Sequence, residues 1–123
     1  MTAPGHAEAR RLALALPGAV ESAHVGKADF RVGGKIFASL PDAGLVVLKF
    51  LADQQALRVA AFPEAFAPVP GRWGRKGWTR LRLAAADMDL LQDALVAAWR
   101  NVAPRRRQGE ATATSAPGHS PRS

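Results

Sequence analysis

The chain has 123 residues and no cysteine, and its 17 basic and 10 acidic side chains give a formal net charge of +7. This length suits one domain with a core of its own, and the lack of cysteine excludes disulfides, thiolate metal sites and a cysteine nucleophile. Hydrophobic residues make up 48% of the chain, which excludes general disorder.

The first expected element is an amphipathic helix over residues 4–16. Thr2 is placed to cap its N-terminus, and Pro17 followed by Gly18 ends it. Its arginines fall on the side opposite its apolar stripe, so we expect the helix to pack on a sheet. The stripe consists of Ala9, Leu12, Ala13 and Leu16.

A strand-rich block follows this helix. After a short strand over residues 20–25, the segment ADFRVGGKIFASL places Gly33 and Gly34 as a two-residue hairpin turn between two strands. A further turn at residues 41–44 leads into LVVLKFL, another alternating strand. Short turns between successive strands predict an antiparallel meander. The positions expected to face the core are Phe30, Val32, Val46, Leu48 and Phe50, and those expected to face outward are Asp29, Arg31 and Lys49.

A second, short helix is expected from Asp53 to residue 61. The segment FPEAFAPVP breaks this helix, and WTRLRL then predicts the last strand. The helix is expected to turn Leu57, Ala60 and Ala61 inward. The strand is expected to carry Trp78, Arg80 and Arg82 on one face and Thr79, Leu81 and Leu83 on the other.

A third helix begins at Asp87, which caps it, and stops before Pro104. From Arg105 onward almost nothing is available to bury, so residues 105–123 are expected to be a basic, disordered tail. Together the elements predict one α+β domain over residues 1–104, an antiparallel meander with N-terminal and C-terminal helices packed on it. The inward positions of the third helix are Met88, Leu91, Leu95, Ala98, Trp99 and Val102.

The positive charge is concentrated in two segments. Five basic side chains and no acidic one lie between Arg72 and Arg82, and four arginines accompany a single glutamate in residues 104–123. The rest of the chain is close to neutral. Because neighbouring cations reinforce each other within a Debye length of about 8 Å, this concentration favours an anionic partner.

Three familiar kinds of site fit the sequence poorly. Gly26 and Lys27 lack the glycine and the hydroxyl residue of a phosphate-binding P-loop, because Glu21 and Ala28 hold those positions. The three histidines fall on separate elements, whereas a metal site needs converging ligands. The carboxylates have capping or turn roles available, and no pair is spaced for acid–base catalysis. We therefore expect no metal, no cofactor and no catalytic residue.

The segment GRWGRKGW, residues 71–78, combines glycines, tryptophans and cations. One interpretation is a glycine-rich turn beneath the tryptophans, because no helix follows it directly to present N–H groups to a pyrophosphate. The other is a nucleic-acid surface, in which tryptophans stack on bases and cations meet phosphates. We expect Trp73 to be the exposed tryptophan, because it lies between turn glycines, and Trp99 to be buried.

Three segments in this order resemble the MmcQ/YjbR family: LPGAVESAHVGKADFRVGGKIFASL, FAPVPGRWGRKGWTRLRL and LLQDALVAAWRNVAPRRR. The resemblance extends over residues 9–107 and implies a domain similar to the bacterial frataxin (CyaY) fold, described as a double-wing DNA-binding architecture. It implies no catalytic residue. Iron binding of the frataxin kind is not implied either, because it relies on an acidic ridge that the first helix lacks. The family's shared positions would be His24, Lys27, Phe30, Arg31, Gly34, Lys35, Pro70, Trp73, Gly74, Lys76, Gly77 and Trp78.

We therefore expect a small, monomeric, non-enzymatic module that binds nucleic acid, DNA in particular. No signal segment opens the sequence and no apolar run reaches the roughly 18 residues of a membrane span, so we expect it in the cytoplasm. The expected surface comprises Lys27, Arg31, Lys35, Arg72, Trp73, Arg75, Lys76, Trp78 and Arg80.

Two alternatives stay open. In the first, a small anionic or aromatic molecule binds in a cleft lined by His24, Lys27, Trp73 and Trp78. In the second, the basic surface meets an acidic protein partner. Nucleic-acid binding should depend steeply on salt. Binding of a small ligand should depend weakly on salt and should quench tryptophan fluorescence. The third interpretation predicts binding only to one particular protein.

Overall fold

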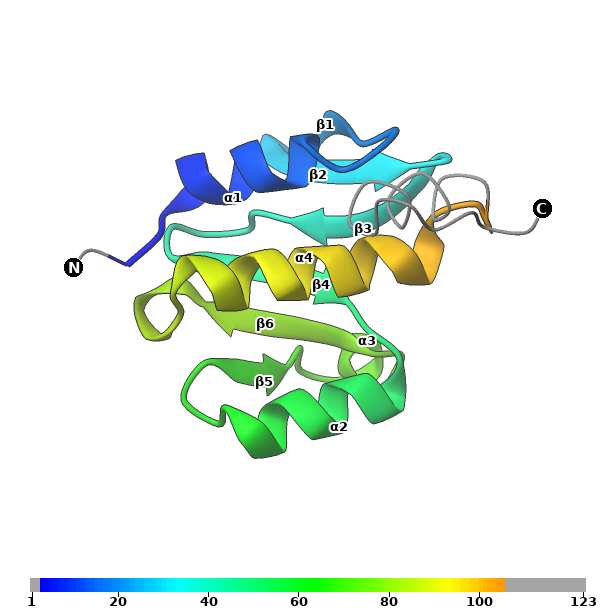
Figure 1. Cartoon of the computed structure of the whole chain (residues 1–123). Helices are drawn as coiled ribbons and strands as arrows, with labels where there is room; N and C mark the ends of the chain where they lie inside the picture. The colour runs from blue at the N-terminus through cyan, green and yellow to red at the C-terminus, as the bar shows by residue number, and fades with distance from the viewer. Residues whose placement is uncertain (1–2, 106–123) are drawn as a thin grey trace, which may run out of the picture.

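Six antiparallel strands form one sheet, and helices cover one of its faces (Figure 1). The structure is a computed structural model that describes residues 3–105. Thr2, expected to cap the first helix, and nearly all of the expected tail lie outside the described residues. The elements are α1 (His6–Leu14), β1 (Val20–His24), β2 (Lys27–Val32), β3 (Lys35–Ser39), β4 (Leu45–Lys49), α2 (Ala52–Ala61), β5 (Phe66–Pro68), α3 (Arg72–Arg75), β6 (Trp78–Arg82), the 3₁₀ turn η1 (Leu83–Ala85) and α4 (Met88–Val102).

The strand order is β1-β2-β3-β4-β6-β5, so only the first four strands form the expected meander. The α+β class is confirmed, but the expected last strand, β6, enters between β4 and a strand that the sequence analysis missed. This strand, β5, lies in the proline-rich segment that was predicted only to break a helix. Its Pro68 is tolerated because β5 is an edge strand, where a missing N–H donor costs little.

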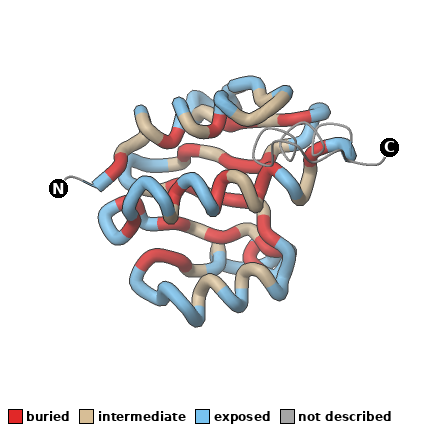
Figure 2. The backbone as a smooth tube through the Cα atoms, in the orientation of Figure 1, coloured by how far each residue is buried: buried red, intermediate tan, exposed pale blue. Residues whose placement is uncertain are grey.

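The core lies between the sheet and the two terminal helices (Figure 2). Asp87 caps α4 as predicted, its carboxylate accepting a hydrogen bond of 2.8 Å from the N–H of Leu90. Trp99 is fully buried, also as predicted, and its indole N–H donates to the carbonyl oxygen of Pro17, 2.9 Å away. This bond ties α4 to the turn that follows α1. Met88, expected inward, is exposed and is the first residue of the helix.

The β2–β3 hairpin forms as predicted, with both Gly33 and Gly34 at positive φ. A β-bulge then shifts the register between Phe30 and Arg31. Asp29 was expected to face solvent, yet it is only 3% exposed. It does point away from the helices, but it lies low in a hollow of the open sheet face and is paired with Arg31.

The inward face of α2 differs from the expected one. Leu57 is 72% exposed, and Ala60 and Ala61 are also exposed. The face turned to the domain carries Gln55, Arg58 and Val59. Gln55 makes hydrogen bonds to the segment before β6, Arg58 lies over the ring of Phe50, and Val59 packs against the core. Within residues 3–105, no helix has the length and apolar character needed to cross a membrane.

Candidate functional site

Within residues 3–105, no helix layer covers the face of the sheet opposite α1, α2 and α4 (Figure 1). Strand pairing aligns Asp29 with Ser39, Ser39 with Val47, and Val47 with Arg80. Paired residues project from the same face of a sheet, so these four side chains form one row across β2, β3, β4 and β6. Residues more than fifty positions apart in the chain are thereby brought together.

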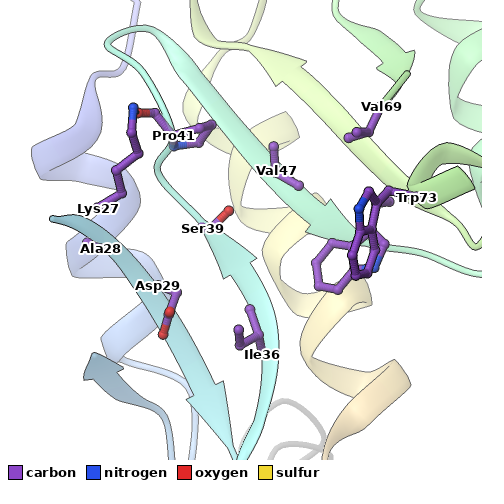
Figure 3. A pocket seen from close by; sticks show the side chains of 10 residues that line it. Lys27, Ala28, Asp29, Ile36, Ser39, Pro41, Val47, Val69 and Trp73 are labelled. Atoms are coloured by element: carbon purple, nitrogen blue, oxygen red, sulfur yellow. The ribbon is translucent and has the colours of Figure 1, made fainter. Parts of the chain in front are cut away.

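A hollow of about 320 Å³ opens on this face (Figure 3). Its volume is at the lower end of the roughly 300–1,000 Å³ that is usual for ligand pockets. The lining is mainly apolar and aromatic, with a few polar groups. It consists of Lys27, Ala28, Asp29, Ile36, Ser39, Pro41, Val47, Val69, Trp73 and Trp78.

Trp73 and Trp78 form one wall of the hollow. Their rings meet edge to face, with centroids 6.4 Å apart and an interplanar angle of 74°. Trp73 is 58% exposed and Trp78 is half-buried, so the prediction that Trp73 is the more exposed of the pair is confirmed. Lys76 and Lys49 each place an ammonium group 5.5 Å from a ring centroid, over Trp73 and Trp78 respectively. The wall is therefore both aromatic and cationic.

The glycines of residues 71–78 are required by close packing. A Cβ atom at Gly74 would collide with the carbonyl oxygen of Val69, and one at Gly77 with the carbonyl oxygen of Phe50. The interpretation of the segment as a tight turn is incomplete, because it contains the single helical turn α3. This turn lifts Trp73 onto the open face while the glycines let the chain pass beneath it.

Some of the predicted basic side chains form hydrogen bonds or ion pairs within the domain, and others do not. Lys27 donates to the carbonyl oxygen of Pro41 at 2.6 Å and to the carboxylate of Asp42 at 3.0 Å. Arg31 makes two hydrogen bonds to Asp29, at 2.9 and 3.2 Å, and the carboxylate raises the pKa of the guanidinium. Among residues 3–105, no hydrogen bond or ion pair forms at the side chains of Arg72, Arg75 and Arg80.

Lys35 and His24 stand apart from the group around Trp73. Lys35 is the cross-strand partner of the buried Val32, so it projects from the helix-covered face rather than the open one. His24 lies at the end of β1, paired through its backbone with Lys27, and its side chain falls outside the described part of the structure. In the described part, no group of three His, Asp or Glu side chains is close enough to hold a metal ion.

Several residues of this face were not predicted as site residues. Ser39, Val47 and Ile36 join the hollow only through strand register, which a single sequence does not reveal. Lys49 was expected merely to point outward. Burial, with a smaller contribution from the charge of Lys76, lowers its pKa, and its ammonium donates to the carbonyl oxygen of Lys76 at 2.6 Å.

Comparison with known proteins gives two matches. The model of the YjbR family matches residues 14–101. The crystal structure of Deinococcus radiodurans protein DR2400, with the domain DUF419, is similar, with a TM-score of 0.64 over 92% of each chain. At 19% sequence identity, this likeness supports the fold alone. No curated protein matched the chain.

Proposed function

This chain belongs to the YjbR family, and we propose that it is a non-enzymatic module that binds single-stranded nucleic acid, DNA in particular, on the open face of its sheet. One observation carries the proposal. The exposed ring of Trp73 lines an apolar hollow, and three arginines on the same elements as the two tryptophans, Arg72 and Arg75 on α3 and Arg80 on β6, have side chains without a partner in the described part of the protein.

The chemistry of this face suits an unpaired strand. An exposed indole stacks on a base, whatever its sequence, and contributes about 1–3 kcal/mol per base. The surrounding arginines neutralise phosphates and release counterions. A duplex keeps its base faces stacked on each other and cannot offer one to Trp73, so a single strand is the better partner.

A titration in salt tests the proposal. Labelled single-stranded and duplex DNA of equal length are bound to the full chain over a range of salt concentrations. We expect tighter binding of the single strand, quenching of tryptophan fluorescence, and a slope of log K against log salt of about −0.7 for each phosphate contacted. No binding of either DNA near physiological salt would contradict the proposal.

A small-molecule ligand is the second candidate, and the shape of the hollow favours it. Its apolar lining and modest volume would enclose one aromatic molecule, with Lys27 at the rim and Asp29 on the floor as the charged groups. Such a ligand would quench tryptophan fluorescence with little dependence on salt. The same titration therefore separates the two functions.

We further propose that the protein acts as a monomer in the cytoplasm. The absence of cysteine is compatible with a reducing compartment. Light scattering of the free and DNA-bound protein checks the monomer, because a dimer would double the scattering mass.

A further inference from the structure

The hollow on the open face has a polar floor that stacking on Trp73 does not use. Asp29 and Ser39 are cross-strand partners on β2 and β3, and both line the hollow (Figure 3). The third polar group, Lys27, is held at the rim by Pro41 and Asp42. The floor therefore offers one carboxylate and one hydroxyl in otherwise apolar surroundings.

The Asp29 carboxylate retains hydrogen-bonding capacity. Arg31 occupies one acceptor position on each oxygen, through two nitrogen atoms at 2.9 and 3.2 Å. A carboxylate has about four such positions, so one remains on each oxygen. Because Arg31 already binds both oxygens in a bidentate manner, each remaining position accepts a hydrogen bond from a single donor. The Ser39 hydroxyl forms no side-chain hydrogen bond within residues 3–105 and is available beside it.

We propose that the hollow receives one unstacked base of the bound strand and prefers a base whose Watson–Crick edge carries an amino group next to a ring-nitrogen acceptor, namely cytosine or adenine. The amino group donates to Asp29, the Ser39 hydroxyl donates to the ring nitrogen, and the Trp73–Trp78 wall packs against the ring. Uracil and thymine present a keto oxygen at the same place, which the carboxylate repels. This inference rests on the proposed function.

Size and charge agree with this occupant. A hollow of about 320 Å³ is large enough to enclose one planar base. The arginines without partners, Arg72, Arg75 and Arg80, lie on the segments that border it, so the phosphates of a strand entering the hollow meet positive charge. The positive charge attracts the phosphates of the strand, and the buried carboxylate favours a base that carries an amino group.

The test uses short thymidine strands in which one central position is deoxycytidine, deoxyuridine or an abasic site. Cytosine and uracil differ at the two atoms that Asp29 and Ser39 are proposed to contact. We expect the full chain to bind the cytosine strand at least about fivefold more tightly than the uracil strand, as for a good pair of base contacts. Asp29→Asn should bring this ratio close to one, whereas Asp89→Asn, on the exposed face of α4, should leave it unchanged.

A second variant guards against misfolding of Asp29→Asn, whose effect on the unfolding midpoint is measured in parallel. Val47→Trp fills the hollow while leaving both Asp29 and Arg31 in the sequence, and it should make the three strands bind equally while the salt slope stays the same. Equal affinity of the unaltered protein for all three strands, with steep salt dependence, would overturn the base site and leave strand binding standing. Binding of no strand would overturn both, and a cytosine preference that survives both substitutions would overturn the assignment to this hollow.

Discussion

Gln55 on α2 donates its side-chain amide to the carbonyl oxygen of Gly74, 3.0 Å away in the segment that carries Trp73. The same nitrogen lies 3.1 Å from the carbonyl oxygen of Trp78 and 3.0 Å from the hydroxyl of Thr79. The Thr79 hydroxyl in turn donates to the carbonyl oxygen of Gly77 at 2.8 Å. One side chain on the helix-covered side therefore fixes both ends of the segment that forms the aromatic wall on the other side.

Replacing Gln55 with Ala should loosen this wall. The carbonyl oxygens of Gly74 and Trp78 would each keep a backbone donor but lose the Gln55 amide, at a cost of about 0.5–1.5 kcal/mol in the free energy of unfolding. Urea titration gives this value, and fluorescence anisotropy reports the affinity for single-stranded DNA, which should fall as Trp73 loses its fixed position. Gln92→Ala, on the exposed side of α4, is the matched control. Identical behaviour of the two variants would mean that Gln55 does not hold the segment.

Trp99→Ala should be the most damaging of the aromatic substitutions. Trp99 is fully buried beneath the sheet, and truncation of such a side chain costs about 3–5 kcal/mol. Arg75→Ala, at an exposed position, should change the free energy of unfolding by less than about 0.5 kcal/mol. Urea titration compares the two directly. Similar midpoints would indicate that α4 does not pack as described.

Gly77→Ala should destabilise the domain far more than Gly34→Ala. Both glycines have positive φ, at 102° and 80°, so both substitutions strain the backbone, by about 1–2 kcal/mol. Only at Gly77 would the added methyl group also collide with the carbonyl oxygen of Phe50, whereas the space around Gly34 is open. Thermal unfolding of the two variants isolates the steric contribution. Equal melting temperatures would show that Phe50 can move aside at no cost.

Sequence patterns predicted those parts of the fold in which periodicity and chemistry agree. The hairpin at Gly33 and Gly34, the two faces of β6 and the capped helix α4 follow from alternation, turn residues and an N-cap. The strand β5 was missed because three prolines surround and enter it, and only its edge position makes Pro68 acceptable. The face of α2 was predicted wrongly because an alanine-rich helix held by Gln55 and Arg58 carries little apolar contrast.

The candidate site was predictable only in part for a related reason. The aromatic and basic segment stands out in the sequence, and its two tryptophans do lie together. The polar floor depends on strand register, which aligns Asp29 with Ser39 across a bulged hairpin. Alternation predicted correctly that Asp29 points away from the helices. It could not predict that Arg31 and the hollow would bury the carboxylate there.

The location of the positive charge, rather than its amount, should decide strand binding. Arg75 and Lys76 lie beside the exposed Trp73, so replacing both with Ala should remove about two phosphate contacts. The slope of log K against log salt should then become shallower by about 1.4 on a single strand, at about 0.7 per phosphate. Anisotropy titrations at several salt concentrations measure this slope.

The control for the Arg75 and Lys76 double variant removes two positive charges from the helix-covered side of the sheet. Lys35 and Arg100 are exposed, and they project from the helix-covered side of the domain, so Lys35→Ala combined with Arg100→Ala leaves the open face untouched. If the proposed face binds the strand, the control should keep the slope of the unaltered protein and lose little affinity, since charges beyond a Debye length of about 8 Å are largely screened. Equal losses in the two variants would mean that the strand responds to total charge and that Trp73 does not mark its path.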